Sequence, residues 1–273
     1  MSSRYLQPDE PSEAATHADA APAKVVQLAA PADNPQPGDE FTLDADLLRQ
    51  NLITGFDPSN SESHPYFVMR SQLLKHAVSK DEHVFAITSV QPGNGKTHIA
   101  VNLAAALSRI RPTVLIELDL RRPSIGDRLG LPSQHLGIDD YLSGTHEFAA
   151  SGIHIEGFNL VVHRVRQHHD DAESLLASSR LTDMTNAARS AENSPICIID
   201  TPPAVVHDDM MLIAPAIDGI LMVVQEARTP KRALLDTIKS LSPTPIIGSI
   251  LNMSISSAPP SRDLDYYYGR TRK

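Results

Sequence analysis

The sequence predicts an α/β protein with a mostly parallel, doubly wound sheet flanked by helices. Short, nearly continuous runs of valine, isoleucine and leucine alternate with longer segments of helical composition. Such strands are buried on both faces, which requires helices on both sides of a parallel sheet. The predicted strands are 84–90, 113–119, 158–165, 195–200, 219–225 and 245–252, and the helices between them include 98–107, 172–191 and 231–241.

Composition limits the kinds of partner. The 273 residues suffice for one substantial α/β domain or two small ones, and the net charge of −9 argues against nucleic acid as the main partner. The only cysteine, Cys197, excludes a disulfide framework and favours a reducing compartment. The sequence shows neither a signal-peptide core nor an apolar run near the ~20 residues of a membrane span. We therefore expect a cytoplasmic protein without a direct membrane span.

The first strand leads into a turn and then a strong helix, SVQPGNGKTHIAVNLAAAL, from Ser89 to Leu107. A phosphate-binding loop requires this order, because backbone N–H groups and a helix N-terminus then point at one anion. Val90 stands where the common pattern GxxxxGK[ST] has its first glycine. We expect Lys96 to reach the β- and γ-phosphates and the Thr97 hydroxyl to coordinate Mg²⁺. The predicted nucleotide-binding residues are Pro92, Gly93, Asn94, Gly95, Lys96, Thr97 and His98.

Three acids end two other predicted strands. Glu117 and Asp119 are two residues apart, and so on the same side of one strand, while Asp200 ends another. A carboxylate that follows four apolar residues is costly if it is buried unpaired. An ordinary structural interpretation therefore needs a cationic partner such as Lys96 or Arg121. A metal-bound nucleotide accounts for all three acids, and we predict that they bind Mg²⁺ together with Thr97.

Three motifs in this order resemble those of the bacterial tyrosine kinases of polysaccharide loci, the BY-kinases, a branch of the deviant P-loop ATPases. The first is SVQPGNGKT, because this family has a Pro-Gly pair ahead of Gly-Lys-Thr and dispenses with the early glycine. The second is LIELDLRRP, and the third is IIDTPPAVVHDD, in which Asp209 follows Asp200 by nine residues. The resemblance covers roughly residues 84–252 and implies a P-loop NTPase fold that uses ATP and Mg²⁺.

The plasmid-partition and division-site ATPases are near relatives of that family. Their loops have a lysine ahead of two glycines, KGGxGK[ST], whereas Gln91 and Pro92 occupy the first two of these positions here. The acidic net charge also argues against DNA-dependent partition. The kinase branch therefore fits the sequence better.

Composition and apolar spacing divide the chain into four predicted parts. Residues 1–40 are rich in proline, alanine and acids and are expected to be disordered. Residues 41–82 form a helical extension, and residues 83–253 form the P-loop ATPase or kinase domain. Residues 254–273 are expected to be a flexible tail with a tyrosine cluster.

The function implied by the resemblance is that of an ATP-dependent protein-tyrosine autokinase that regulates exopolysaccharide or capsule synthesis and export. Lys96 would neutralise charge as the γ-phosphoryl group moves. Glu117 or Asp119 would accept the tyrosine proton, and Asp200 would organise the metal. Such kinases act with a transmembrane chain-length regulator, so we expect a membrane adaptor of this kind. The adaptor would hold the protein at the periphery of the inner membrane. We also expect a homo-oligomer.

The tail contains the phosphoacceptors that the resemblance implies. Tyr266, Tyr267 and Tyr268 are adjacent to one another and follow Asp263 and Asp265. Kinases of this family autophosphorylate such clusters in trans. The alternative is a solvated aromatic tail that is not a substrate.

Two departures from the family pattern leave a second function open. Glu117 stands where the family has aspartate, and of the helical pattern ExxRxxR, which packs protomers into a ring, only Arg70 is present; His64 and Phe67 replace the other two residues. We interpret Phe67 as helix core. The departures favour a catalytically weak, nucleotide-gated scaffold ATPase of the polysaccharide export machinery, which binds ATP and phosphorylates nothing.

Overall fold

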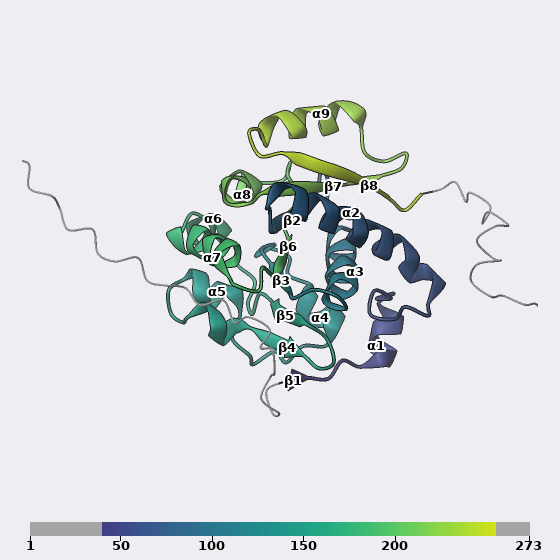
Figure 1. Ribbon diagram of the computed structural model, residues 1–273. Helices are drawn as coiled ribbons and strands as arrows, with labels where there is room; N and C mark the ends of the chain where they lie inside the picture. The colour runs from purple at the N-terminus through teal and green to yellow at the C-terminus, as the bar shows by residue number, and fades with distance from the viewer. Residues whose placement is uncertain (1–39, 255–273) are drawn as a thin grey trace, which may run out of the picture.

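The computed structural model describes residues 40–254 as eight strands in one sheet with helices on both faces (Figure 1). Residues 1–39 and 255–273 lie outside the described residues, and with them most of the segment predicted to be disordered and the whole tyrosine cluster. The strands are β1 Glu40–Phe41, β2 Val84–Ser89, β3 Thr113–Glu117, β4 Ile153–Ile155, β5 Leu160–His163, β6 Ile196–Asp200, β7 Gly219–Gln225 and β8 Ile246–Asn252. The α-helices are α1 Ala45–Gln50, α2 His64–Lys80, α3 Lys96–Ser108, α4 Ile125–Leu129, α5 Ile138–Leu142, α6 Ala172–Leu176, α7 Ser179–Ser190, α8 Asp209–Ile213 and α9 Lys231–Ser240.

The strand order is β1-β4-β5-β3-β6-β2-β7-β8, and every neighbouring pair is parallel except the antiparallel pair β4–β5. The predicted fold class is therefore confirmed. The carboxyl ends of β2, β3 and β6 meet at one edge of the sheet, because Ile87 and Glu117 both pair with Asp200. No helix among residues 40–254 is long and apolar enough to cross a bilayer.

Two apolar layers hold the helices to the sheet. Alternate residues of β2 face opposite layers, as a strand's period of two requires: Val84 and Ala86 contact one, Phe85 and Ile87 the other. The layer that contains Phe85 also includes buried residues of α2, α3 and α4, whereas the opposite layer includes residues of α5, α6, α7 and α8 (Figure 1). Both faces are covered, which is why the strands are apolar throughout.

The segment that precedes β2 is packed against α3. The side-chain oxygen of Asn102 accepts hydrogen bonds from the backbone N–H groups of Thr54 and Gly55, at 2.8 and 2.9 Å. A Cβ on Gly55 would lie 2.2 Å from the Asn102 carbonyl oxygen, so this close approach requires glycine. On α2, Arg70 donates to the Ala106 carbonyl oxygen and lies over the Phe67 ring. Phe67 itself is half-buried and lines a surface groove, so its prediction as helix core is wrong.

Three details of the fold differ from the sequence prediction. Glu40 and Phe41 form a strand that pairs with β4, and neither β1 nor β4 was predicted. The helix predicted over 172–191 is two helices, α6 and α7, and the Ser178 hydroxyl between them caps the second by accepting from the Arg180 N–H. Serine disrupts a helix interior because its side chain competes for the backbone.

Candidate nucleotide-binding site

The loop between β2 and α3 has the backbone of a phosphate-binding turn. Gly93 and Gly95 have φ angles of +77° and +84°, a left-handed conformation that favours glycine. A Cβ on Gly95 would also lie 2.3 Å from the side-chain nitrogen of Asn252. That nitrogen donates to the Asn94 carbonyl oxygen at 2.9 Å, and the Asn94 amide donates to the Thr229 hydroxyl at 3.1 Å. The end of β8 and the segment after β7 therefore hold the loop in place.

Lys96 lies at the start of α3 and points at the acids of the neighbouring strands. Its Nζ is 2.8 Å from Asp119 Oδ2, and the two side chains are 14% and 5% exposed. Burial alone would lower the pKa of Lys96, but the negative charges of Asp200 and Asp119 outweigh it and raise that pKa. The lysine is therefore fully charged in a site that contains several carboxylates.

Asp200 differs from Glu117 and Asp119 because its carboxylate accepts no hydrogen bond from residues 40–254. It is fully buried, and neither carboxylate oxygen has a hydrogen-bond partner in the described part of the chain. Burial raises the pKa of Asp200 to about 6, against the opposing charge of Lys96 and the Thr97 hydroxyl, which lies close by without meeting hydrogen-bond geometry. A buried carboxylate without a partner is unfavourable. Beside the Thr97 hydroxyl, it fits a hard cation or a water bound to one.

Glu117 has a different environment from the other two acids. One carboxylate oxygen accepts from the N–H groups of Ser124 and Ile125, at 2.5 and 2.8 Å, and the other accepts from Val165 N–H at 2.9 Å. The side chain is fully buried, and burial raises the pKa of Glu117 to about 7. Its oxygens therefore bind the start of α4 and the segment after β5, although the strand pattern places Glu117 beside Asp119.

Asp209, the acid nine residues after Asp200, contacts Arg121. The Nε of Arg121 lies 2.8 Å from Asp209 Oδ2, and its Nη2 lies 2.5 Å from Glu173 Oε1. Oxygens of Glu173, Asp208 and Asp209 approach one another closely enough to share a cation. The guanidinium of Arg121 already supplies positive charge to two of them, so this acidic cluster is partly neutralised within the chain.

A pocket of about 580 Å³ opens over the loop. Its walls are the glycine-rich loop and start of α3, the turn 50–52 after α1, Arg128 of α4, and residues 252–253. Leu52 and Met253 both line it, are 62% and 50% exposed, and have left-handed backbone conformations with φ of +56° and +54°. Strained residues of this kind concentrate at ligand sites. The sequence analysis identified the loop but not Leu52, Arg128, Asn252 or Met253.

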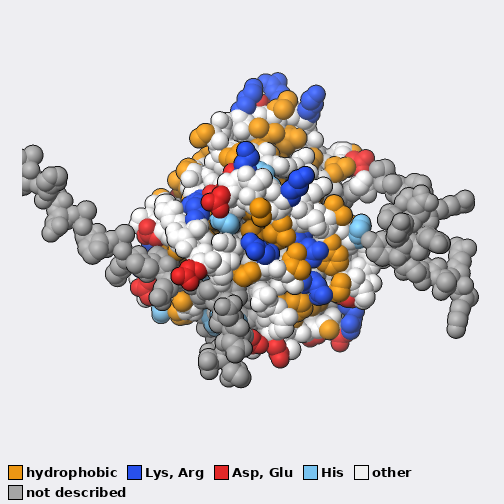
Figure 2. Space-filling view, in the orientation of Figure 1, with side chains coloured by type: hydrophobic (Ala, Val, Ile, Leu, Met, Phe, Trp, Pro, Cys, Tyr) orange, Lys and Arg blue, Asp and Glu red, His pale blue; other side chains and the backbone are white. Residues whose placement is uncertain are grey.

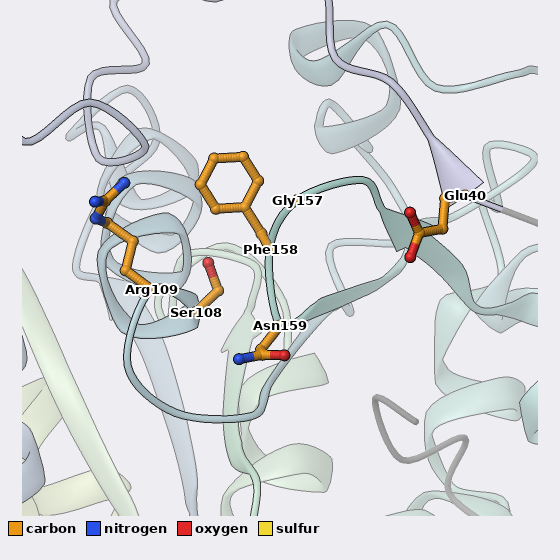
Figure 3. A pocket seen from close by; sticks show the side chains of 6 residues that line it. All are labelled: Glu40, Ser108, Arg109, Gly157, Phe158 and Asn159. Atoms are coloured by element: carbon orange, nitrogen blue, oxygen red, sulfur yellow. The ribbon is translucent and has the colours of Figure 1, made fainter. Parts of the chain in front are cut away.

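A second pocket, of about 320 Å³, lies at the other end of α3 (Figure 3). Arg109 and Phe158 are on one side of it and Glu40 is on the other. Since the 13 residues of α3 span about 20 Å, this pocket is remote from the glycine-rich loop. No residue predicted to bind nucleotide or metal lines it.

Comparison with known proteins relates the chain to bacterial kinases. No profile of a known protein family matches it. It is 29% identical over 198 residues to the tyrosine-protein kinase CpsD of Streptococcus agalactiae, a match that covers 71% of this chain and 85% of CpsD. It is 32% identical over 180 residues to the succinoglycan biosynthesis transport protein ExoP of Rhizobium meliloti (strain 1021), which covers 63% of this chain. The chain spans only 22% of ExoP.

Structural comparison agrees with the sequence matches. The solved kinase domain of VpsO is 27% identical, with a TM-score of 0.64, and the alignment covers 76% of this chain and 97% of that domain. In this chain the glycine-rich loop follows a central strand, β2, and acids end the next two strands on one side of it, β6 and β3. With its three ordered motifs, this chain is similar in sequence and in fold to the bacterial tyrosine kinases, the BY-kinase branch of the P-loop ATPases.

Proposed function

We propose that the protein transfers the γ-phosphoryl group of ATP to tyrosine. The observation that supports this most directly is the convergence of Lys96, Asp119 and Asp200 on the glycine-rich loop: a buried lysine–carboxylate pair beside a buried carboxylate without a hydrogen-bond partner. Kinases need such a cation for the phosphates and such carboxylates for metal and proton.

In this proposal the tyrosine oxygen attacks the γ-phosphorus, the bond from that phosphorus to the β–γ bridging oxygen breaks, and ADP leaves. Lys96 offsets the charge on the phosphates, and Asp119 accepts the tyrosine proton. Thr97, Asp119 and Asp200 are the residues that would hold Mg²⁺, which supplies positive charge to the phosphate oxygens. Glu117 acts as an anchor, because its oxygens already accept three backbone N–H groups.

The process that this activity serves is polysaccharide synthesis and export. Two relatives support this: CpsD is a tyrosine-protein kinase, and ExoP is a succinoglycan biosynthesis transport protein. We propose that the protein acts as a homo-oligomer, located at the inner membrane through a transmembrane chain-length regulator. Tyr266, Tyr267 and Tyr268 are the proposed phosphoacceptors; they lie outside the described residues.

One experiment tests the proposal. The purified full chain, with its adaptor, is incubated with ATP and Mg²⁺ and probed for phosphotyrosine, with the Lys96→Met variant as the control. We expect a signal that depends on ATP, Mg²⁺ and Lys96. Nucleotide binding without any phosphotyrosine would instead favour the scaffold ATPase. The observation behind that second function is that Glu117, which replaces the family aspartate, is bound by backbone amides.

A further inference from the structure

Arg128, on α4, is a cation of the nucleotide pocket that the known motifs do not include. It lines the pocket together with Lys96 and Thr97. Its side chain forms no salt bridge or hydrogen bond within residues 40–254, and its Nε is buried without a partner. Arg121, by contrast, is paired with two acids. Arg128 is therefore a charged side chain available to a ligand.

Arg128 faces the same cavity as the glycine-rich loop. The residues that line this pocket with it include Gly93 and Gly95 of the loop and Lys96 at the start of α3. The side chain of Arg128 therefore borders the space along which the phosphates would extend.

The fold holds α4 in this position from two sides. Glu117 accepts hydrogen bonds from Ser124 and Ile125, the residues at the start of α4. The side chain of Asn51 donates to the Arg128 carbonyl oxygen at 3.0 Å. An arginine fixed in this way, with a buried donor unsatisfied, has already lost much of the hydration and freedom that ligand binding would otherwise cost.

We propose that Arg128 binds the phosphate chain of the bound nucleotide as the second cation of the site, after Lys96. The inference rests on the proposed function. During transfer the γ-phosphoryl group passes from the bridging oxygen to the tyrosine oxygen, and negative charge spreads over its equatorial oxygens. A guanidinium donates several N–H groups in a fixed plane and suits such oxygens.

The test compares Arg128→Ala and Arg128→Lys with Arg232→Ala, which removes an arginine that is 95% exposed on α9 and does not line the pocket. Binding of a fluorescent ATP analogue with Mg²⁺ is titrated for each full-length variant, and phosphotyrosine formation is timed separately. We expect Arg128→Ala to weaken nucleotide binding about 10- to 100-fold, from the loss of charge-assisted hydrogen bonds. Arg128→Lys should retain part of the affinity, and Arg232→Ala should bind like the wild type.

Wild-type affinity and wild-type phosphotyrosine formation in a folded Arg128→Ala variant would overturn the inference. Lys96→Met separates this failure from a failure of the proposed function. If Lys96→Met loses nucleotide and Arg128→Ala does not, only the role of Arg128 is wrong. If neither variant loses nucleotide, the assignment of the loop is wrong as well. Arg128→Lys keeps the charge and the helix, so it remains informative if Arg128→Ala fails to fold.

Discussion

Lys96 and Asp119 form an ion pair, with 2.8 Å between Nζ and Oδ2, that joins the glycine-rich loop to the motif after β3. The pair is shielded from solvent, so its attraction is screened little by salt. Under the proposed function, phosphates that enter the pocket would meet a lysine that already has an acidic partner. Nucleotide binding would then weaken the contact between Lys96 and Asp119, and this would couple the two motifs directly.

We predict that Lys96→Met abolishes measurable nucleotide binding or turnover and leaves the domain folded. It should also cost about 3 kcal/mol of stability, because removal of one partner leaves Asp119 buried and unpaired. The double variant Lys96→Met/Asp119→Asn should recover much of that stability and none of the binding. Titration with labelled nucleotide and urea unfolding measure the two effects, with Lys231→Met, at an exposed position, as the control. Full affinity in Lys96→Met would refute the assignment of the loop.

A second prediction concerns Glu117. Glu117→Asp restores the family residue, but the shorter side chain cannot reach the N–H groups of Ser124, Ile125 and Val165 together. We expect a loss of roughly 1–3 kcal/mol from buried N–H groups left unsatisfied. Glu117→Gln should lose a similar amount, since its NH₂ group would face a backbone N–H. Chemical denaturation measures both, with the exposed Glu192→Asp as the control. An Asp variant as stable as the wild type would show that Glu117 does not anchor α4.

The pH dependence of stability should depend on His163. This side chain is fully buried, with its Nδ1 2.8 Å from the Ser151 hydroxyl oxygen, and burial lowers the pKa of His163 to about 3. In the unfolded chain the ordinary pKa is about 6.5. Between these values the unfolded chain binds a proton that the folded protein does not. The contribution of His163 is therefore present above pH 6.5 and decreases as pH falls towards 3, by up to roughly 1.4 kcal/mol per pH unit.

Urea unfolding at pH 7 and pH 5 tests this sign. The difference in unfolding free energy between the two pH values should be smaller for His163→Phe than for the wild type. The exposed His207→Gln should leave that difference unchanged. Equal differences in wild type and His163→Phe would mean that another group causes the acid sensitivity. His163→Phe also changes packing against Phe148, but this effect is the same at both pH values. It therefore cancels when the free energy at pH 5 is subtracted from that at pH 7.

The tail prediction concerns Tyr266, Tyr267 and Tyr268. Replacing all three with phenylalanine should remove most autophosphorylation and leave ATP binding intact, because the substitutions lie outside the loop. Each phosphate would add about −1.5 to −2 charge to a protein already at −9, and that repulsion would loosen an assembly. The triple variant should therefore stay in its closed oligomeric form when ATP is added. Mass spectrometry and size-exclusion chromatography measure the two outcomes.

Other tyrosines are poor acceptors within the described fold. Tyr141 is 1% exposed, and its hydroxyl donates to the Arg180 carbonyl oxygen. The Tyr66 hydroxyl lies 3.0 Å from His98 Nε2. Phosphotyrosine that persists in the triple variant and maps to Tyr5, Tyr66 or Tyr141 would contradict the assignment of the tail.

The central strands were predictable because burial on both faces makes them continuously apolar. β1 and β4 were not, since two or three residues show no period and their pairing depends on chain segments more than 100 residues apart. The break at Ser178 was missed for a related reason: helical composition continues across it, and only the cap shows where α7 begins.

Local chemistry also identified only part of the candidate site. Lys96, Asp119 and Asp200 lie close together, as expected from their positions after the ends of strands. The orientation of Glu117 was not predictable, because it depends on where the start of α4 folds back. Arg128 has no sequence pattern of its own and reaches the pocket only through the packing of α4.

The hydrogen bond from Asn252 to the Asn94 carbonyl oxygen also holds the end of β8 beside the glycine-rich loop, so the C-terminal tail starts next to the loop. Tyr266 follows Asn252 by fourteen residues, so covalent geometry alone limits its reach to about 50 Å from the loop. Within that radius the local concentration of acceptor is independent of how dilute the protein is. A reaction within one chain would therefore keep its rate on dilution, whereas a reaction between copies would slow unless they stay assembled.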